Sequence, residues 1–360
     1  MDPHPSLYYD PSAGPYRALI GTGGVGSGSF FAIEGSHTLG REESRAGHYL
    51  PRRDYCKLHI IAHYVKRLLG DEFTVIPASK VGDDRRGRQL VDEIRDAGML
   101  TDYLEISPGD ATLFSFCFIY PDGTGGNLTT SDAATQSVSI PFILRLAPEF
   151  ERWSGAGIAL AAPEVPLAAR QALLELGGRH AFFRAAGLTS QEARSRDAAG
   201  IIANADLLAL NLDEAAALGS ETTDAPIHSV IEAAQRAACH HNPNIHLSIT
   251  TGRGGSWCWD GTDWTHTRAY RVEAVGTAGA GDAHLAGMLA GLAARLSLPL
   301  AQQLASLAAA FSVTSPHTIH PDLDRPALAQ FAHVQAAALD LQVSRLLGEP
   351  PTSQIEEVHP

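Results

Sequence analysis

A glycine-rich segment that ends on an aspartate carries the clearest chemical signal in the sequence. It reads Val275-Gly276-Thr277-Ala278-Gly279-Ala280-Gly281-Asp282 and precedes a stretch with helical spacing. Main-chain N–H groups at the start of a helix bind anions, and small residues leave them accessible. A carboxylate at such a site repels the anion, so its presence there indicates that it has a chemical task. Transfer of a phosphoryl group to an alcohol needs both an anion site and a base for the hydroxyl proton.

The residues after Asp282 are predicted to form a helix. Apolar side chains recur three and four residues apart at Leu285, Met288, Leu289, Leu292 and Leu296, and therefore share one face. Taken alone, the segment has a second interpretation, in which Asp282 only caps the helix or lies in its first turn.

A second motif follows the predicted strand at residues 205–210. Asn211 and Glu214 have the spacing of a capping box, in which each side chain bonds the other residue's backbone N–H. The same two side chains could hold Mg²⁺ through water beside phosphates. Both interpretations can be true together.

A third motif follows the predicted strand at residues 245–250. Thr250, Gly252 and Gly255 combine a hydroxyl that can bond a phosphate oxygen with glycines that allow close approach to the backbone. An ordinary hairpin loop leading to Trp257 is the better explanation if this segment stands alone.

The run Gly21-Thr22-Gly23-Gly24-Val25-Gly26 matches the GxGxxG spacing of dinucleotide-binding loops. That fingerprint also requires a helix at the third glycine and an acidic residue about 20 positions on. Ser27-Gly28-Ser29 is a poor helix start, and Glu42 and Glu43 lie in an arginine-flanked stretch. An NAD-dependent oxidoreductase is therefore the disfavoured alternative from a different class. A P-loop is excluded because GxxxxGK[ST] does not occur.

Composition limits the remaining possibilities. The 360 residues carry a net charge of −13, which argues against nucleic acid as a partner. Four cysteines without CxxC spacing indicate reduced thiols and a cytoplasmic protein. Residues 1–15 lack the apolar region of a signal peptide, and no apolar stretch approaches the ~18 residues of a membrane span. The sixteen histidines show no metal-ligand spacing.

Strand and helix signals alternate along the chain. Strands are predicted at 16–20, 73–76, 158–162, 180–185, 205–210, 245–250 and 268–275, and helices at 54–69, 82–97, 166–176, 213–218, 230–239, 298–313 and 326–347. Hairpins are predicted at 111–120, with a turn at Asp122-Gly123, and at 257–264. This order predicts a doubly wound, three-layer α/β fold with a mainly parallel sheet, whose ligands bind at the carboxyl ends of the strands.

These motifs, in this order, resemble those of the ribokinase-like (PfkB) carbohydrate and nucleoside kinases. The family's Asp-Thr-x-Gly-Ala-Gly-Asp signature is matched by Gly276 to Asp282, its Asn-x-x-Glu by Asn211 to Glu214, and its Thr-x-Gly-x-x-Gly by Thr250 to Gly255. Its Val-Gly-x-Asp-x-x-Gly is similar to Val81 to Gly87. The resemblance covers about residues 16–320.

The resemblance implies a role for each matched residue. Asp282 would be the base, and the N–H groups of Gly279, Ala280 and Gly281 would form the anion hole. It also implies ligands for the cofactors: Asn211 and Glu214 would position Mg²⁺ through water, and Thr250, Gly252, Gly255 and Thr277 would lie at the ATP site. One domain is expected at 16–347, with a small antiparallel β lid from segments about 21–50 and 108–130, and a disordered tail at 348–360.

The acceptor side departs from the family pattern. Gly276 replaces the first aspartate of the signature, so dependence on a monovalent cation is in doubt, and His284 stands where an aromatic residue is usual. The N-terminal sugar-binding pattern is not recognisable, and Tyr55-Cys56-Lys57 stands near the expected Gly-Gly. Arg41, Arg45, Arg52 and Arg53 fit an anionic or heavily hydroxylated acceptor, or simply a solvated basic face.

The sequence thus predicts an ATP- and Mg²⁺-dependent kinase that phosphorylates an alcohol group of a sugar or related small polyol. A nucleoside kinase and a non-catalytic nucleotide-binding relative are the alternatives within the family. We expect no nucleic-acid or membrane partner, and the family analogy allows a homodimer formed through the lid.

Overall fold

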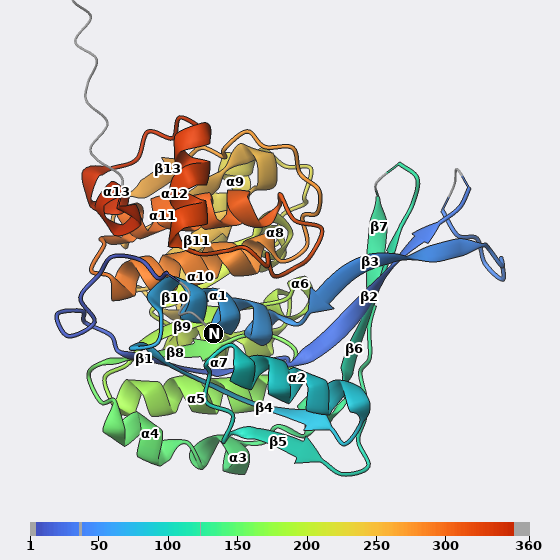
Figure 1. Cartoon of the computed structure of the whole chain (residues 1–360), viewed down its shortest axis with the longest axis horizontal. Coiled ribbons are helices and arrows are strands. Elements are labelled where there is room, and N and C mark those ends of the chain that lie inside the picture. The colour runs from blue at the N-terminus through green and yellow to red at the C-terminus, as the bar shows by residue number, and fades with distance from the viewer. Residues whose placement is uncertain (1–4, 36–37, 123, 349–360) are drawn as a thin grey trace, which may run out of the picture.

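A computed structural model describes residues 5–35, 38–122 and 124–348 of the chain. Gly123 of the predicted turn and all but the first residue of the predicted 348–360 tail lie outside the described residues. The described part has a large central sheet between two layers of helices and a smaller sheet that projects from one side (Figure 1). The predicted three-layer α/β class is confirmed.

The central sheet has nine strands in the order β13-β12-β11-β10-β9-β8-β1-β4-β5. Their bounds are β1 Ala18–Thr22, β4 Thr74–Gly82, β5 Leu104–Ser107, β8 Gly157–Ala161, β9 Phe183–Gly187, β10 Leu207–Asn211, β11 His246–Thr250, β12 Ser256–Trp259 and β13 Trp264–Thr267. All neighbours from β5 to β11 are parallel, and the β12–β13 hairpin is antiparallel. β1 and β8 are buried at every position, as expected for strands covered on both faces.

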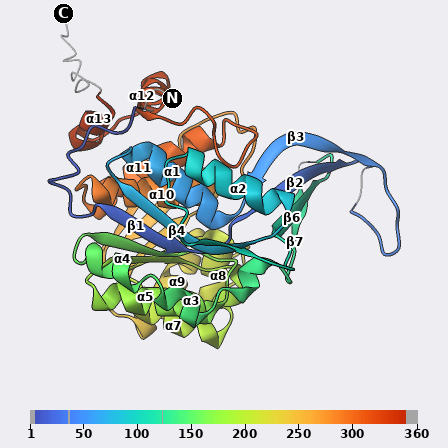
Figure 2. The same ribbon diagram turned by 60° about the horizontal axis from the view of Figure 1, so that its bottom comes forward.

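Helices cover both faces of this sheet (Figure 2). One layer, packed in the largest apolar cluster, contains α1 Lys57–Leu69, α2 Arg85–Asp96, α10 Ala280–Ala293, α11 Leu298–Ser312, α12 Arg325–Val334 and α13 Leu341–Leu347. The other contains α3 Ile140–Leu144, α4 Ala147–Arg152, α5 Leu167–Arg179, α6 Ser190–Ala193, α7 Ala199–Asn204, α8 Leu212–Gly219 and α9 Ile227–His241. None of the helices in the described ranges is long and apolar enough to cross a membrane.

The direction in which strands are added reverses between β1 and β8. From β1 the chain adds β4 and β5 on one side, and later adds β8 to β11 on the other. Loops that leave the carboxyl ends of β1 and β8 therefore turn to opposite faces, and such a switch point opens a crevice where ligands bind in doubly wound folds. The structure thus predicts a ligand near the residues that follow Thr22 and Ala161.

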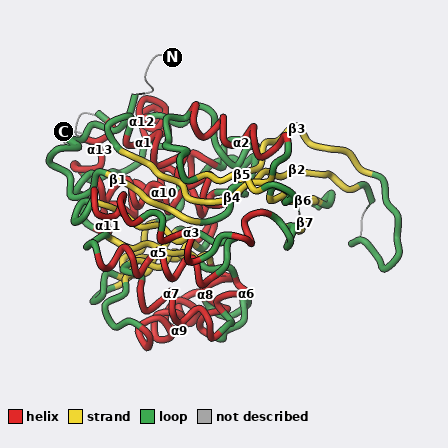
Figure 3. The backbone as a smooth tube through the Cα atoms, turned by 90° about the horizontal axis from the view of Figure 1, so that it is seen from below, coloured by secondary structure: helices red, strands yellow, loops and turns green. Residues whose placement is uncertain are grey.

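The smaller sheet has four strands in the order β3-β2-β6-β7, with bounds β2 Gly26–Ile33, β3 Gly47–Tyr55, β6 Leu113–Ile119 and β7 Gly125–Thr129. The β2–β3 and β6–β7 pairs are antiparallel, and β2 and β6 are parallel. Both segments predicted to form a lid, 21–50 and 108–130, contribute strands to this sheet. It extends beyond the helical layers (Figure 3).

Three sequence predictions are wrong. The helix predicted from Asp54 begins only at Lys57, because residues 47–55 pair with β2. Residues 268–275 form no strand, and the segment 326–347 divides into α12 and α13. The GxGxxG run, which the sequence already disfavours as a dinucleotide site, is followed by strand β2 from Gly26 and not by a helix. The dinucleotide-binding interpretation therefore fails, because no helix N-terminus follows these glycines.

Candidate active site

The three predicted motifs lie at the carboxyl edge of the central sheet. Asn211 ends β10 and Thr250 ends β11, and the two residues are partners in the parallel register. Asp282 lies in the first turn of α10, which contacts β10. Motifs separated by as many as seventy positions in the sequence therefore meet at one edge.

The glycine segment forms a helix N-terminus with open backbone. The 14-residue helix α10 begins at Ala280, two residues before the predicted start, and Gly279 is its N-cap with a left-handed φ of 81°. A side chain at Gly279 would come within 2.8 Å of the Thr318 carbonyl oxygen, whereas a Cβ on Gly281 meets no atom within 4 Å. Gly279 therefore shapes the turn, and Gly281 leaves room for a ligand against the N–H groups.

Asp282 forms an ion pair with a lysine of a different helix. Lys57 Nζ lies 3.7 Å from Asp282 Oδ1, and the two side chains are 33% and 14% exposed. Burial raises the pKa of Asp282, and the Lys57 ammonium opposes that increase. The Asp282 carboxylate in turn raises the pKa of Lys57 above its usual value. The Lys57 charge therefore favours the carboxylate form of Asp282, and the side chain still reaches solvent, as a base requires.

Lys57 is the first residue of α1, and Glu164 holds its backbone. The Lys57 N–H donates to Glu164 Oε2 at 3.1 Å. Glu164 follows β8 with a left-handed φ of 78°, and Gly24 after β1 gives its carboxylate room, because a Cβ there would overlap it. Burial raises the pKa of Glu164 to about 7. A strained acid thus lies at the β1–β8 switch point, where we expect a ligand.

The Asn211–Glu214 motif forms a reciprocal capping box. Asn211 Oδ1 accepts from the Glu214 N–H, and Glu214 Oε2 accepts from the Asn211 N–H, both at 2.8 Å. The structural interpretation is therefore confirmed. Burial raises the pKa of Glu214, and the Lys57 charge opposes this, which places Glu214 within electrostatic reach of Lys57. A role in holding Mg²⁺ stays a prediction.

In the loop after β11, the two glycines predicted to lie at the ATP site, Gly252 and Gly255, have different surroundings. Gly252 has a left-handed φ of 58° and open space at its Cβ position. Gly255 is buried, and a Cβ there would overlap the Thr267 carbonyl oxygen of the β12–β13 hairpin. The Thr251 hydroxyl closes the turn by donating to the Gly255 carbonyl at 3.0 Å. Gly252 is thus accessible to a nucleotide, whereas Gly255 serves the hairpin.

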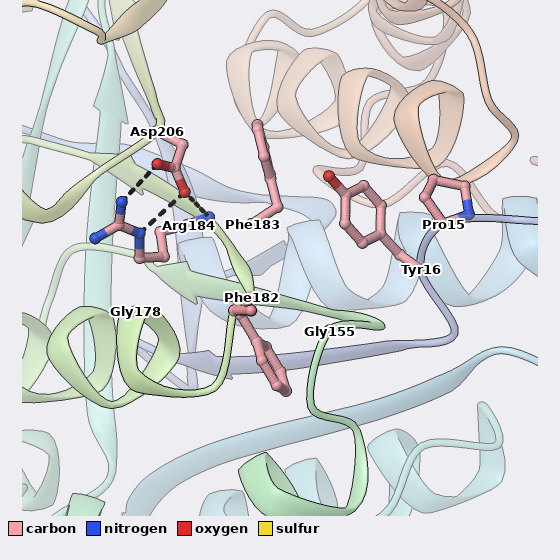
Figure 4. A pocket seen from close by; sticks show the side chains of 9 residues that line it. Pro15, Tyr16, Gly155, Gly178, Phe182, Phe183, Arg184 and Asp206 are labelled. Carbon is pink, nitrogen blue, oxygen red and sulfur yellow. Dashed lines mark hydrogen bonds and ion pairs between the residues drawn. The ribbon is translucent and has the colours of Figure 1, made fainter.

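A separate pocket lies at the opposite edge of the sheet. It has a volume of about 510 Å³, and Tyr16, Phe183, Arg184 and Asp206 are among its lining residues (Figure 4). Arg184 and Asp206 are bonded to each other through two guanidinium contacts of 2.9 and 2.6 Å. Their charges are therefore mutually satisfied, and none of the predicted site residues lines this pocket.

Sequence reasoning missed Lys57, Glu164 and the buried Asp54 of β3. Asp54 and Lys57 fell within a predicted helix, and Glu164 stood in an unassigned link between strand and helix. The helical periodicity hid the change from strand to helix at Cys56, which is the N-cap of α1. No spacing rule in the sequence joins these three positions.

The fold and this edge of the sheet define a ribokinase-like α/β protein. The family model described as "pfkB family carbohydrate kinase" matches residues 61–325, more than half of the chain. The chain belongs to this family and is a kinase.

Solved structures agree with the fold. A ribokinase from Cryptococcus neoformans in complex with ADP superimposes with a TM-score of 0.72 at 20% identity, covering 88% of this chain and 99% of that one. An Arabidopsis thaliana ribokinase with ribose and ATP gives 0.69 at 16%, covering 88% and 98%. A Burkholderia thailandensis nucleoside kinase with inosine gives 0.67 at 17%, covering 88% and 98%. The search of curated proteins finds no match.

Proposed function

We propose that this kinase transfers the terminal phosphoryl group of ATP to an alcohol group of a sugar or related small polyol. One observation carries the proposal: the partly exposed Asp282, paired with Lys57, lies in the first turn of α10, directly after Gly281, where no atom lies within 4 Å of the Cβ position. Of the three N–H groups in the proposed anion site, that of Ala280 donates to the Thr277 carbonyl oxygen at 3.3 Å. A base and an anion site are thus adjacent, which in-line transfer to a hydroxyl requires.

Each of these residues has a defined task in the proposed reaction. Asp282 accepts the proton of the acceptor hydroxyl, while the N–H groups of Gly279, Ala280 and Gly281 stabilise negative charge on the transferred group. Lys57 keeps Asp282 ionised and adds a positive charge beside the reacting atoms. Closure of the small sheet over the site would exclude water and so limit wasteful hydrolysis.

The surroundings fit a nucleotide and a magnesium ion. Thr277 is exposed beside the anion site, and the open backbone at Gly252 and Gly281 leaves room for phosphates. In the described part of the chain, no group of three acidic, histidine or cysteine side chains could hold a metal directly. Mg²⁺ would therefore be held by phosphates and by waters positioned by Asn211 and Glu214, where it neutralises phosphate charge.

Release of ADP from MgATP tests the proposal. We expect product with at least one member of a panel of pentoses, hexoses, polyols and nucleosides, and loss of that product in Asp282→Asn. Asp224→Asn, on an exposed loop, is the matched control and should behave as wild type. Preference for nucleosides would support the nucleoside-kinase alternative. Binding of ATP without product from any acceptor would support the non-catalytic alternative.

We also propose a homodimer formed through the small sheet. On one face of this sheet, the aromatic rings of Phe31, Tyr49 and Phe116 contact one another. Tyr49 is 67% exposed and Leu128 is 64% exposed. Exposed apolar patches of this kind commonly mark interfaces. Light scattering should give twice the monomer mass for the wild type, and the monomer mass for Tyr49→Glu. A wild-type monomer at micromolar concentration would refute the proposal.

A further inference from the structure

Asp54 is a buried carboxylate on the face of the small sheet opposite to Phe31 and Phe116. It lies in β3, is 7% exposed, and is paired in register with Gly28 of β2, which is in turn paired with Ser115 of β6. A Cβ on Gly28 would overlap the Asp54 carboxylate. The absence of a side chain at Gly28 thus lets the carboxylate lie across the middle of the sheet.

The donors around this carboxylate do not offset its burial. Burial raises the pKa of Asp54 more than hydrogen bonding from Cys117, Ser115 and the Tyr55 backbone lowers it. Cys117 Sγ donates to Asp54 Oδ2 at 3.7 Å and a thiol is a weak donor, and the Ser115 hydroxyl is shared with Asn127 Oδ1 at 2.6 Å. Buried carboxylates are normally held by several strong donors. Asp54 therefore has capacity to accept hydrogen bonds from a ligand.

Asp54 lies beside the reaction centre. The Tyr55 N–H donates to the Thr318 hydroxyl at 3.0 Å, and the Thr318 carbonyl oxygen packs against Gly279, the N-cap of α10. One buried residue thus contacts both the strand that carries Asp54 and the proposed anion hole. Burial raises the pKa of Asp54, and the Asp282 charge adds a smaller increase, which is consistent with this proximity.

The charges around the acceptor side are mostly negative. Asp54, Glu164 and Asp282 interact electrostatically with one another or with Lys57, and Lys57 is already paired with Asp282. An acceptor bearing a phosphate or carboxylate would be repelled by the ionised members of this group. A neutral or cationic acceptor would not.

Three of the four arginines that could have favoured an anionic acceptor have their contacts away from Asp54. Arg41 lies 3.8 Å from Glu42 and is almost fully exposed. Arg45 pairs with Glu43 at 2.7 Å. The guanidinium group of Arg52 lies 5.7 Å from the centre of the Phe30 ring. These contacts match the solvated or packed basic face that the sequence left open.

We infer that Asp54 accepts hydrogen bonds from hydroxyl groups, or from an ammonium group, of the acceptor. The acceptor is accordingly an uncharged or amino-bearing polyol, and not a phosphorylated or carboxylated one. This inference rests on the proposed function, and it assigns the acceptor side of that same site. The carboxylate of Asp54 is well suited to paired hydroxyls because it offers two acceptor oxygens and no donor when ionised.

Binding to matched pairs of probes tests the charge class independently of catalysis. Saturation-transfer NMR with a non-hydrolysable ATP analogue and Mg²⁺ would compare ribose with ribose 5-phosphate, fructose with fructose 6-phosphate, and glucosamine or glucose with gluconate. We expect the uncharged or amino member to bind at least tenfold more tightly in the pair that binds best. Equal or tighter binding of the anionic member, or binding of no uncharged or amino member, overturns the inference.

Two variants test Asp54 itself. We expect Asp54→Asn and Asp54→Ala to weaken the preferred acceptor at least tenfold, with the affinity for the ATP analogue unchanged. Asp122→Asn makes the same change at an exposed turn of the same sheet and should leave both affinities unchanged. Unchanged acceptor binding in both Asp54 variants overturns the inference.

The two proposals fail in different ways. If the wild type binds a neutral polyol through Asp54 but forms no ADP with MgATP, the proposed function fails and the acceptor inference stands. If the wild type phosphorylates an acceptor whose KM is the same in Asp54→Asn, the acceptor inference fails and the proposed function stands. In the expected result, Asp54→Asn raises the acceptor KM at least tenfold and changes kcat less than about threefold.

Discussion

The two sides of the candidate site are built from different parts of the chain. On the phosphate side, the backbone at Gly281 and Gly252 faces open space, and short contiguous motifs supply both positions. On the acceptor side, the polar groups belong to separate strands, with Asp54 on β3, Ser115 and Cys117 on β6, and Asn127 on β7. A site made of backbone groups comes from consecutive residues and can be recognised as a sequence motif. A site made of side chains from several strands forms only after those distant strands pair.

The comparison between the two sides of the site can be tested by substitution, and the largest expected effect is the loss of kcat in Asp282→Asn. Asp282→Asn should lower kcat by roughly 10²–10⁴-fold, or about 3–5 kcal/mol, because the acceptor hydroxyl loses its base. The affinity for nucleotide, measured by titration calorimetry, should be unchanged because the N–H groups stay in place. Turnover equal to wild type would remove Asp282 from the mechanism.

Lys57 tests whether a side chain of the acceptor side tunes the base. Lys57→Met should lower kcat about 10–100-fold near neutral pH. Because the Lys57 ammonium opposes the rise in the pKa of Asp282, its removal should move the acidic limb of the kcat profile to higher pH.

The matched control for Lys57→Met is Lys80→Met, which removes a lysine paired with Glu105 at 2.9 Å in a different part of the sheet. A pH profile of Lys57→Met that superimposes on that of the wild type would contradict the role assigned to Lys57.

Substitutions of Gly279 and Gly281 should have different effects, one on the stability of the fold and the other on the KM for ATP. Gly281→Ala adds a methyl group where no atom lies within 4 Å, so the protein should remain as stable as wild type while the KM for ATP rises about tenfold. Gly279→Ala places alanine at a left-handed φ of 81° and against Thr318, and should destabilise the fold by about 1–2 kcal/mol or more.

Thermal unfolding and ATP titration of Gly279→Ala and Gly281→Ala distinguish these outcomes. A destabilised Gly281→Ala with normal ATP affinity would show that this glycine serves the fold and does not accommodate phosphate.

The last expected effect concerns stability on the acceptor side. Burial raises the pKa of Asp54 to about 6, above its usual value of 3.8. The stability associated with its protonated form is therefore present below about pH 4 and is lost as the pH rises through 6. At pH 8, Asp54→Asn should be more stable than wild type by on the order of 2–3 kcal/mol, and this difference should shrink towards pH 4.

Denaturant unfolding at pH 4, 6 and 8 measures the effect of Asp54→Asn. Asp224→Asn is the control and should change the free energy of unfolding by less than about 0.5 kcal/mol at each pH. An Asp54→Asn protein that is less stable than wild type at pH 8 would show that the carboxylate supports the fold. The expected gain would show the opposite, a residue kept for binding at the expense of stability.

Sequence reasoning succeeded where local rules decide the structure. The alternation of strands and helices predicts the layers, and the capping box at Asn211 and Glu214 forms as its spacing requires. The hairpin at 257–264 is likewise present, because Asp260-Gly261 is a local turn signal.

It failed where pairing between distant segments decides. Residues 54–55 have apolar neighbours at helical spacing, yet they continue β3 because β2 offers them a hydrogen-bonding edge. The strand predicted at 268–275 fails for the opposite reason, since no strand of the described sheets pairs with it. Asp54 and Glu164 were missed on the same grounds, because their importance lies in neighbours that only the tertiary structure supplies.

The contacts of Thr318 have a mechanical consequence. Its hydroxyl accepts from the Tyr55 N–H and its N–H donates to the Arg53 carbonyl oxygen, both along one edge of β3, and its carbonyl oxygen abuts Gly279. The projecting sheet consequently cannot swing about its base without straining the turn that orients the oxyanion donors. In the proposed reaction, closure of the small sheet over the alcohol would therefore be coupled to the orientation of those N–H groups. With the sheet open and the site empty, the N–H groups would be less well oriented toward the transferred group.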